Sequence, residues 1–218
     1  MFNIKKDIPF TPRERQILGK LSTPGKIQDY LDALPINFEP EGDTVLSPRR
    51  VMREGRAHCI EGAFLAALAL GYHGKPALVM DLVSSRSDLD HVVALFCRKG
   101  HWGALSKTNH AVLRYREPVY RSVRELAMSY FHEYFLDDGR KTLRQYSQPF
   151  DLFSIKNKSW ITSEKNLWHI VDAINSHPHT DILTRSQIAL LRLAHKLERQ
   201  AGKLVEWRKS GKKQKHNL

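Results

Sequence analysis

The feature that most constrains the fold of this chain is an almost continuously apolar segment that runs from Ile60 to Leu70. Apolar side chains cover every side of a helix drawn over it, and a helix that is apolar all round lies buried at the centre of a domain. Its many alanines leave a surface against which a sheet can pack closely. The sequence therefore predicts a buried central helix, bounded by Gly55 and Gly71.

A cysteine, Cys59, stands at the first turn of this predicted helix. The unpaired amides of a helix N-terminus carry about half a positive charge, which favours a thiolate over a thiol. Cys59 is therefore a candidate nucleophile. The alternative is an inert core residue, which is the commoner fate of a free cysteine, and position alone does not decide between the two.

Composition excludes several classes of protein. The 218 residues are 41% hydrophobic and their mean hydropathy is −0.46, which fits one sizeable core with extensions and excludes a disordered chain. The sequence contains no run of eighteen apolar residues, so no membrane span is predicted, and no apolar signal core follows the first residues. Two cysteines without a secretory signal indicate a reducing compartment. We expect a cytoplasmic protein that does not bind membranes; the oligomeric state stays open.

The net charge of +12 is concentrated in part at the C-terminus. From Lys203 onward the chain carries six lysines and arginines against one glutamate. Such a tail is the part of the chain that would contact nucleic acid or an acidic partner. A solvated basic terminus is the interpretation that we favour.

Capping signals and changes of period predict the order of elements. Ser or Thr followed by Pro at positions 11, 23 and 47 predicts three helix starts before the central helix. After Gly71 the pattern becomes that of short strands, which predicts an α+β fold with an antiparallel sheet. We expect a helical lead-in (1–46), a core (47–150) and a C-terminal helical extension with a basic tail (151–218). The expected strands are Pro76–Val83, His91–Cys97, Trp102–Ser106 and Ala111–Tyr115, and the expected later helices start at Ser122 and cover Ser163–Asn175 and Thr184–Trp207.

A thiolate nucleophile needs a base, and the base needs a group that orients it. His91 heads a predicted central strand, where its side chain can face the start of a helix. With Cys59-Ile60-Glu61, the helix to Gly71, a strand and Trp102, this order resembles the transglutaminase-like superfamily of papain-like folds. The resemblance covers about residues 50–115. It implies a papain/transglutaminase-like core in which Cys59 is the nucleophile and His91 the general base and acid.

The third position of the pattern departs from the family. Ser106 stands four residues after the tryptophan, where the family has aspartate. A two-residue turn at Lys99-Gly100 places Ser106 on the face of His91, whereas a three-residue turn would offer Asn109 instead. A neutral group can fix the imidazole tautomer but stabilises imidazolium less than a carboxylate does. We rank Ser106 first and Asn109 second as the orienting residue.

The neighbours of Cys59 act in opposite directions. Glu61 is well placed near a helix N-terminus, yet its charge opposes ionisation of the thiol two residues away. His58 would favour the thiolate if it were protonated. A metal site built on Cys97 and His101 lacks the pairs of ligands that zinc sites have, and no phosphate-binding loop is present, so we expect no metal and no cofactor.

Two hypotheses follow for the function. The first is a cysteine-dependent amide or peptide hydrolase, or an acyl transferase, that acts on a peptide or protein amide through a thioester at Cys59. Hydrolysis is the reaction that we favour. The second is a binding module of the same fold with a weakened or inactive site, which would bind a peptide or an acidic partner. Ser106 in place of aspartate is the feature in favour of the second.

Overall fold

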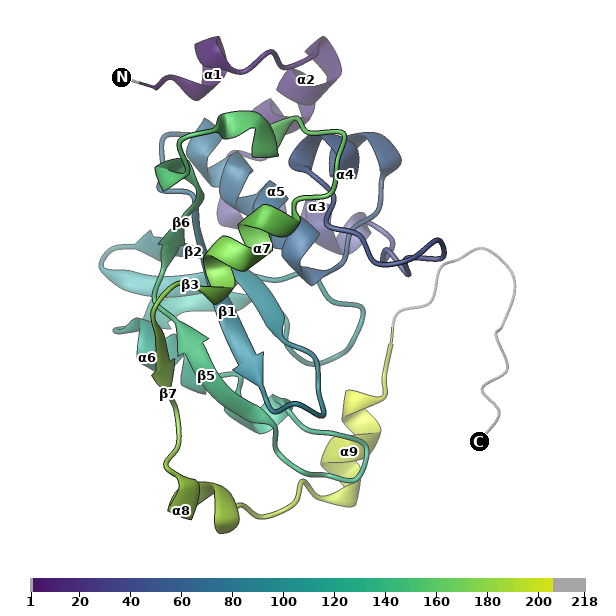
Figure 1. Cartoon of the computed structure of the whole chain (residues 1–218), viewed down its shortest axis with the longest axis vertical. Helices are drawn as coiled ribbons and strands as arrows, with labels where there is room; N and C mark the ends of the chain where they lie inside the picture. Colours follow the sequence, from purple (N-terminus) through teal and green to yellow (C-terminus); the bar gives the residue numbers. More distant parts are fainter. Residues whose placement is uncertain (1, 206–218) are drawn as a thin grey trace.

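The fold is built on one antiparallel sheet with a buried helix against one face (Figure 1). The computed structural model describes residues 2–205. The central helix is α5 (Cys59–Tyr72), and all of its residues from Ile60 to Gly71 are buried. The chain therefore has the α+β fold class that the sequence predicts, with the cysteine-bearing helix at its centre.

Short helices lead into α5 and pack around it, because each begins at a residue that caps it. The side-chain oxygens of Thr11, Thr23 and Ser47 each accept a hydrogen bond from a backbone N–H in the first turn, and a proline follows each cap. All three predicted helix starts are confirmed. These helices are α1 (Ile4–Asp7), α2 (Pro12–Lys20), α3 (Pro24–Ala33) and α4 (Pro48–Glu54).

The sheet runs in the order β4-β3-β2-β1-β5-β7, and β6 pairs with β1 beyond the end of β5. Every pairing is antiparallel. The central position of β1 and β2 explains why their sequences are apolar on both faces. The strands are β1 (Leu78–Ser84), β2 (His91–Arg98), β3 (His101–Leu105), β4 (Arg116–Tyr120), β5 (Leu143–Ser147), β6 (Phe150–Asp151) and β7 (His179–Asp181).

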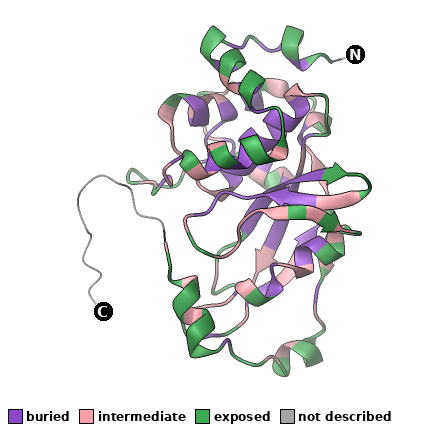
Figure 2. Ribbon diagram, turned by 180° about the vertical axis from the view of Figure 1, so that it is seen from behind, coloured by how far each residue is buried: buried purple, intermediate pink, exposed green. Residues whose placement is uncertain are grey.

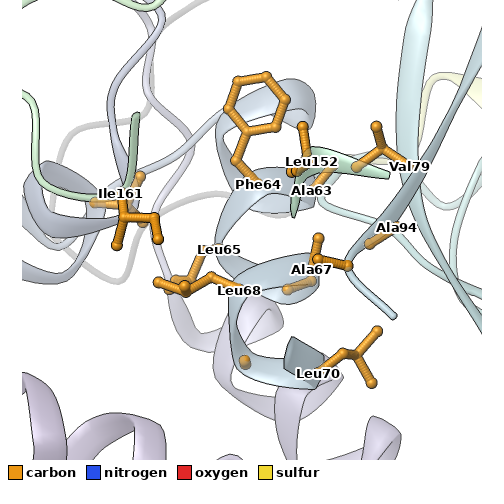
Figure 3. Close-up of a cluster of buried hydrophobic side chains, with 14 of the residues drawn as sticks. Ala63, Phe64, Leu65, Ala67, Leu68, Leu70, Val79, Ala94, Leu152 and Ile161 are labelled. Atoms are coloured by element: carbon orange, nitrogen blue, oxygen red, sulfur yellow. The ribbon is translucent and has the colours of Figure 1, made fainter. Parts of the chain in front are cut away.

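Two hydrophobic cores lie on opposite faces of the sheet. On one face, α5 packs its alanines and leucines against Val79 of β1 and Ala94 of β2, with Leu152 and Ile161 closing the cluster (Figure 3). On the other face, Met80 and the neighbouring apolar residues meet the helix α6 (Val123–Met128) and the 3-10 helix η1 (Phe131–Glu133). Figure 2 shows the buried residues gathered along α5 and the inner strands.

The β2–β3 hairpin has the two-residue turn on which the predicted register depends. Lys99 and Gly100 both have positive φ angles, 51° and 78°, as a tight hairpin turn requires. Ala94 is paired with Leu105, so Ser106 follows opposite Val93 and points to the same face as His91. The register that offers Asn109 is not the one that forms.

The predicted fourth strand is wrong in position. Residues 111–115 form a loop, and β4 follows from Arg116 with Pro118 inside it. Proline is tolerated there because β4 is an edge strand, so the missing N–H removes no bond within the sheet. The sequence predicts no strand near residues 143–147, where β5 forms, because the polar side chains of this segment hide the alternation that marks a strand.

The C-terminal region differs from the two long helices that the sequence predicts. It contains short helices and a strand that joins the sheet. The second predicted helix, Thr184–Trp207, is interrupted at Ala194, whose N–H donates to the Gly139 carbonyl at 2.8 Å. The basic tail after residue 205 lies outside the described residues. The elements are η2 (Leu152–Ser154), η3 (Lys158–Ile161), α7 (Trp168–Asn175), β7, α8 (Arg185–Ala189) and α9 (Lys196–Gly202).

Within residues 2–205, none of the helices has both the length and the apolar character that crossing a membrane requires.

Candidate active site

Cys59 is the first residue of α5, so its thiol lies beside the unpaired amides of the helix N-terminus. Burial alone would raise the pKa of this thiol. Hydrogen bonds from the side chains of His58 and His91, together with the charges of the two rings, outweigh burial and lower the pKa to about 5. The thiol and His91, 32 positions apart in sequence, are thus brought together by α5 and β2.

His58, the residue before α5, is surrounded by oxygens. Its Nε2 lies 2.9 Å from the Thr44 carbonyl oxygen, 3.3 Å from Oε1 of Glu61 and 3.4 Å from Oε1 of Glu39. Burial acts to lower the pKa of His58, but its hydrogen bonds with Cys59 and Glu61 prevail and raise the pKa to about 11. His58 is therefore an imidazolium at neutral pH.

Glu61 is fully buried and fixes the start of α5. Its carboxylate accepts hydrogen bonds from the backbone N–H groups of His58 (2.9 Å) and Leu46 (2.8 Å) and from the Thr44 hydroxyl (2.8 Å). The Asn37 amide donates at 3.1 Å. Although burial raises its pKa, the hydrogen bond and charge of His58 and these donors lower it to about 2, so Glu61 stays ionised.

His91, the first residue of β2, contacts Ser106 through its Nε2 atom, which lies 2.8 Å from the Ser106 Oγ. The Ser106 hydroxyl donates its one proton to the carbonyl oxygen of Leu113 at 2.5 Å. Its oxygen is therefore an acceptor toward the ring, so Nε2 carries the hydrogen of the neutral imidazole. That tautomer leaves the Nδ1 lone pair of His91 free to accept a proton from the thiol.

The main chain of Ser106 is held by a side chain from α3. The Ser106 N–H donates to Oε1 of Gln28 at 3.0 Å, and Nε2 of Gln28 donates to the Ser106 carbonyl at 2.8 Å. Gln28 is buried, and its amide also donates to Asp32 at 2.9 Å. The position of the Ser106 hydroxyl is thus fixed from the N-terminal helices as well as from the hairpin.

Leu113 is held in an unusual backbone conformation by Glu133, which is itself paired with Arg116. Its φ angle is 58°, a left-handed conformation that non-glycine residues adopt rarely. Its N–H donates to Oε2 of Glu133 at 2.7 Å, and the same oxygen pairs with Nη2 of Arg116 at 2.6 Å. These contacts hold the Leu113 carbonyl on the Ser106 hydroxyl.

Within residues 2–205, Asn109, the second-ranked orienting residue, does not hydrogen-bond His91, and neither does Asp90, which precedes His91 in the chain. Asn109 is half-buried in the loop after β3, and among the described residues no hydrogen bond joins it to His91. The Asp90 carboxylate accepts from the N–H and the hydroxyl of Ser84, at 2.7 Å and 3.1 Å. Of the predicted set, the structure gathers Cys59, His91 and Ser106.

Three residues around the site were missed by the sequence analysis. Gln28 and Glu133 lie outside residues 50–115, and nothing in their local sequence marks them. The third is Asp81 of β1, which is buried and whose Oδ2 lies 3.5 Å from Nε2 of His179. Burial and the charge of Asp90 raise its pKa. The sequence does mark this residue, because an acid inside an otherwise apolar strand is unusual.

No three histidine, cysteine, aspartate or glutamate side chains gather to hold a metal ion anywhere in residues 2–205. Cys97 is exposed near the end of β2, and His101 bonds to the carbonyl of Lys99 in the turn.

Comparison with known proteins adds little to this geometry. No family model and no curated protein matches the chain. Among solved structures, the chain is similar to Legionella pneumophila LapG (EGTA-treated), with 12% sequence identity and a TM-score of 0.39. The match covers 67% of this chain and 82% of that chain. A likeness this distant does not assign a family.

Proposed function

We propose that this protein is a cysteine-dependent amide or peptide hydrolase, or an acyl transferase, of the transglutaminase-like class, with Cys59 as nucleophile and His91 as base and acid. The observation that carries the proposal is the convergence of a low-pKa thiol at the start of α5 with a histidine whose tautomer is fixed by Ser106. A nucleophile, a base and an orienting group in contact are the minimum set for covalent acyl transfer.

In the first half of the reaction, the Cys59 thiolate attacks the carbonyl carbon of an amide and forms the C–S bond. The backbone N–H of Cys59 has no acceptor inside the helix and supports the negative oxygen that develops. The C–N bond then breaks, and the leaving amine takes the proton from Nδ1 of His91. The product of this half is a thioester on Cys59.

In the second half, water or an amine attacks the thioester, and Nδ1 of His91 accepts the proton of that nucleophile. The C–S bond breaks and the sulfur leaves as a thiolate. Ser106 keeps the ring in the Nε2–H form during both proton transfers. We favour water as the acceptor, which makes the protein a hydrolase.

The test is acylation of Cys59 by p-nitrophenyl acetate in a Cys97→Ala background, followed by mass spectrometry of the intact protein. We expect fast acetylation at Cys59 and turnover of the acetyl-enzyme. Cys59→Ala should abolish acetylation, and His91→Ala should slow release of the acetyl group. Added glycine amide separates the two outcomes, because a transferase forms N-acetylglycine amide whereas a hydrolase forms acetate.

The binding-module hypothesis makes the opposite prediction. The neutral Ser106 at the orienting position is the observation in its favour, since a hydroxyl stabilises imidazolium less than a carboxylate does. The rate of acetylation at the exposed Cys97 is measured in a single Cys59→Ala variant that keeps Cys97. If Cys59 were acetylated no faster than Cys97, the result would support a module without catalysis.

A further inference from the structure

We propose that His58 is the main cation that keeps Cys59 ionised, so that His91 is left to carry the proton. The inference deepens the function proposed above and rests on it. It divides between two histidines the roles that a single histidine fills in a simple Cys–His pair, and it starts from the contacts of the two rings.

The His58 ring can only be a donor at Nε2. Three oxygens face this nitrogen, at 2.9 Å from Thr44, 3.3 Å from Glu61 and 3.4 Å from Glu39. All three are acceptors, so Nε2 carries a hydrogen. The side chain also hydrogen-bonds the Cys59 thiol, which leaves Nδ1 as the atom that faces the sulfur. With a thiolate as acceptor, both ring nitrogens donate, and that is the imidazolium form.

Buried Glu61 keeps His58 charged. Glu61 is fully buried and stays ionised because the His58 ring faces it and because other donors, including two backbone N–H groups, bond to it. A fixed anion in a buried position favours the charged form of a neighbouring imidazole strongly. The imidazolium contacts both this carboxylate and the thiol of Cys59, so its charge offsets the repulsion between the two anions.

His91 has no comparable support. Its Nε2 faces the neutral hydroxyl of Ser106, and among residues 2–205 no carboxylate lies within hydrogen-bonding distance of its ring. His91 is therefore free to alternate between imidazole and imidazolium, as proton transfer requires. His58, tied to two glutamates, is poorly suited to release its proton during a catalytic cycle.

The charged groups around His58 and Cys59 decide whether the thiolate of Cys59 is favoured or opposed. His58 faces Glu39, Glu61 and the thiol. The thiol faces His58 and His91, and its charge is also felt by Asp81 of β1 and by Tyr134. The carboxylates oppose a thiolate, so the two histidines are the groups that sustain it.

The proton balance of the cycle is consistent with this division. The resting site holds the Cys59 thiolate, the His58 imidazolium and, on Nδ1 of His91, the proton that the reaction moves, while Nε2 of His91 keeps its own hydrogen toward Ser106. His91 gives that proton to the leaving amine as the C–N bond breaks, and regains one from the attacking water. Sulfur leaves as a thiolate and needs no proton, because the His58 charge is already in place.

The experiment is the pH dependence of iodoacetamide alkylation at Cys59, measured without substrate in the Cys97→Ala background. Four proteins are compared: the background itself, His58→Gln, His91→Gln and His101→Gln. The last removes an imidazole of the β2–β3 turn and is the matched control. We expect His58→Gln to raise the thiol pKa by about one to three pH units, which is the effect of losing one adjacent opposite charge. His91→Gln should raise it less, and His101→Gln should leave it unchanged.

A thiol pKa that returns to about 8.5 in His91→Gln would overturn the proposal, because His58 would then not suffice. So would a His58→Gln protein whose thiol still titrates as in the background. Circular dichroism checks that each variant folds, and the His91→Gln result decides the question even if His58→Gln does not fold. Because no substrate is used, absence of acyl transfer would refute the proposed function and leave this measurement intact.

Discussion

The Ser106 hydroxyl lies 2.8 Å from Nε2 of His91, so a neutral group and not a carboxylate orients the ring. A carboxylate would not suit this position, because the neighbouring Leu113 carbonyl requires a hydrogen-bond donor. The hydroxyl proton is given to the Leu113 carbonyl at 2.5 Å, and this bond is what makes the oxygen an acceptor toward the ring. Serine is therefore specified by both of its partners.

Replacement of Ser106 distinguishes these two contacts. Ser106→Ala removes the acceptor for His91, and a hydrogen bond of about 1–3 kcal/mol corresponds to about a 5- to 150-fold loss of acyl-enzyme turnover. Ser106→Asp should not restore the rate, because its carboxylate would face the Leu113 carbonyl, acceptor against acceptor. Turnover of the acetyl-enzyme measures both, with the exposed Ser87→Ala as control. If Ser106→Asp turned over faster than the natural protein, the Leu113 carbonyl would have to move away from the new carboxylate, and serine would not be required at this position.

The thiol of Cys59 should titrate far below an ordinary cysteine. Its pKa is lowered to about 5, so the thiolate is present above that pH and is lost as the pH falls through it. We expect the alkylation rate of Cys59 to rise with a midpoint near pH 5, far below the value of about 8.5 for an ordinary free cysteine. Peptide mapping after iodoacetamide treatment measures alkylation at Cys59 separately from alkylation at the exposed Cys97. A midpoint near 8.5 at Cys59 would contradict the site geometry.

The sequence predicts the parts of this site that depend on local pattern. Proline-led caps, an all-apolar helix and a two-residue turn are set by neighbours within a few positions, and they place Cys59, His91 and Ser106. Gln28 and Glu133 are different, because they reach the site from elements 78 and 20 positions away from the residues they bond. Such contacts depend on how helices dock, which periodicity does not encode.

Gln28→Ala should destabilise the protein and loosen the site together. The substitution leaves the buried N–H and carbonyl of Ser106 without their side-chain partner, and each buried unsatisfied group costs about 1–3 kcal/mol. We expect a loss of about 2–4 kcal/mol in the free energy of unfolding, measured with urea. Gln16→Ala, an exposed glutamine of α2, is the control and should change stability little.

Gly62 lies in the second turn of α5 because the chain leaves no room for a side chain there. A Cβ at this position would lie 2.5 Å from the Cβ of Lys107, the residue after Ser106. Gly62→Ala should therefore destabilise the fold, although alanine is the better helix former by about 1 kcal/mol. Gly19→Ala in α2 meets nothing within 4 Å and should stabilise or leave the fold unchanged. A pair of thermal melts compares them, and a stabilised Gly62→Ala protein would contradict the close packing of α5 on this loop.

Glu61→Gln should remove a pH-dependent part of the stability. The folded pKa of Glu61 is about 2, below the value of about 4.3 expected for an unfolded chain, so its contribution is complete above pH 4.3 and is lost as the pH falls toward 2. The glutamine variant also turns an N–H group toward buried donors. We expect it to lose about 3 kcal/mol at pH 7, and the difference from the natural protein should narrow between pH 4.3 and pH 2. Urea unfolding at pH 7 and pH 3 measures this, with the exposed Glu41→Gln as control. A difference that is the same at both pH values would mean that Glu61 is not ionised in the folded protein, and the anchor proposed for His58 would be lost with it.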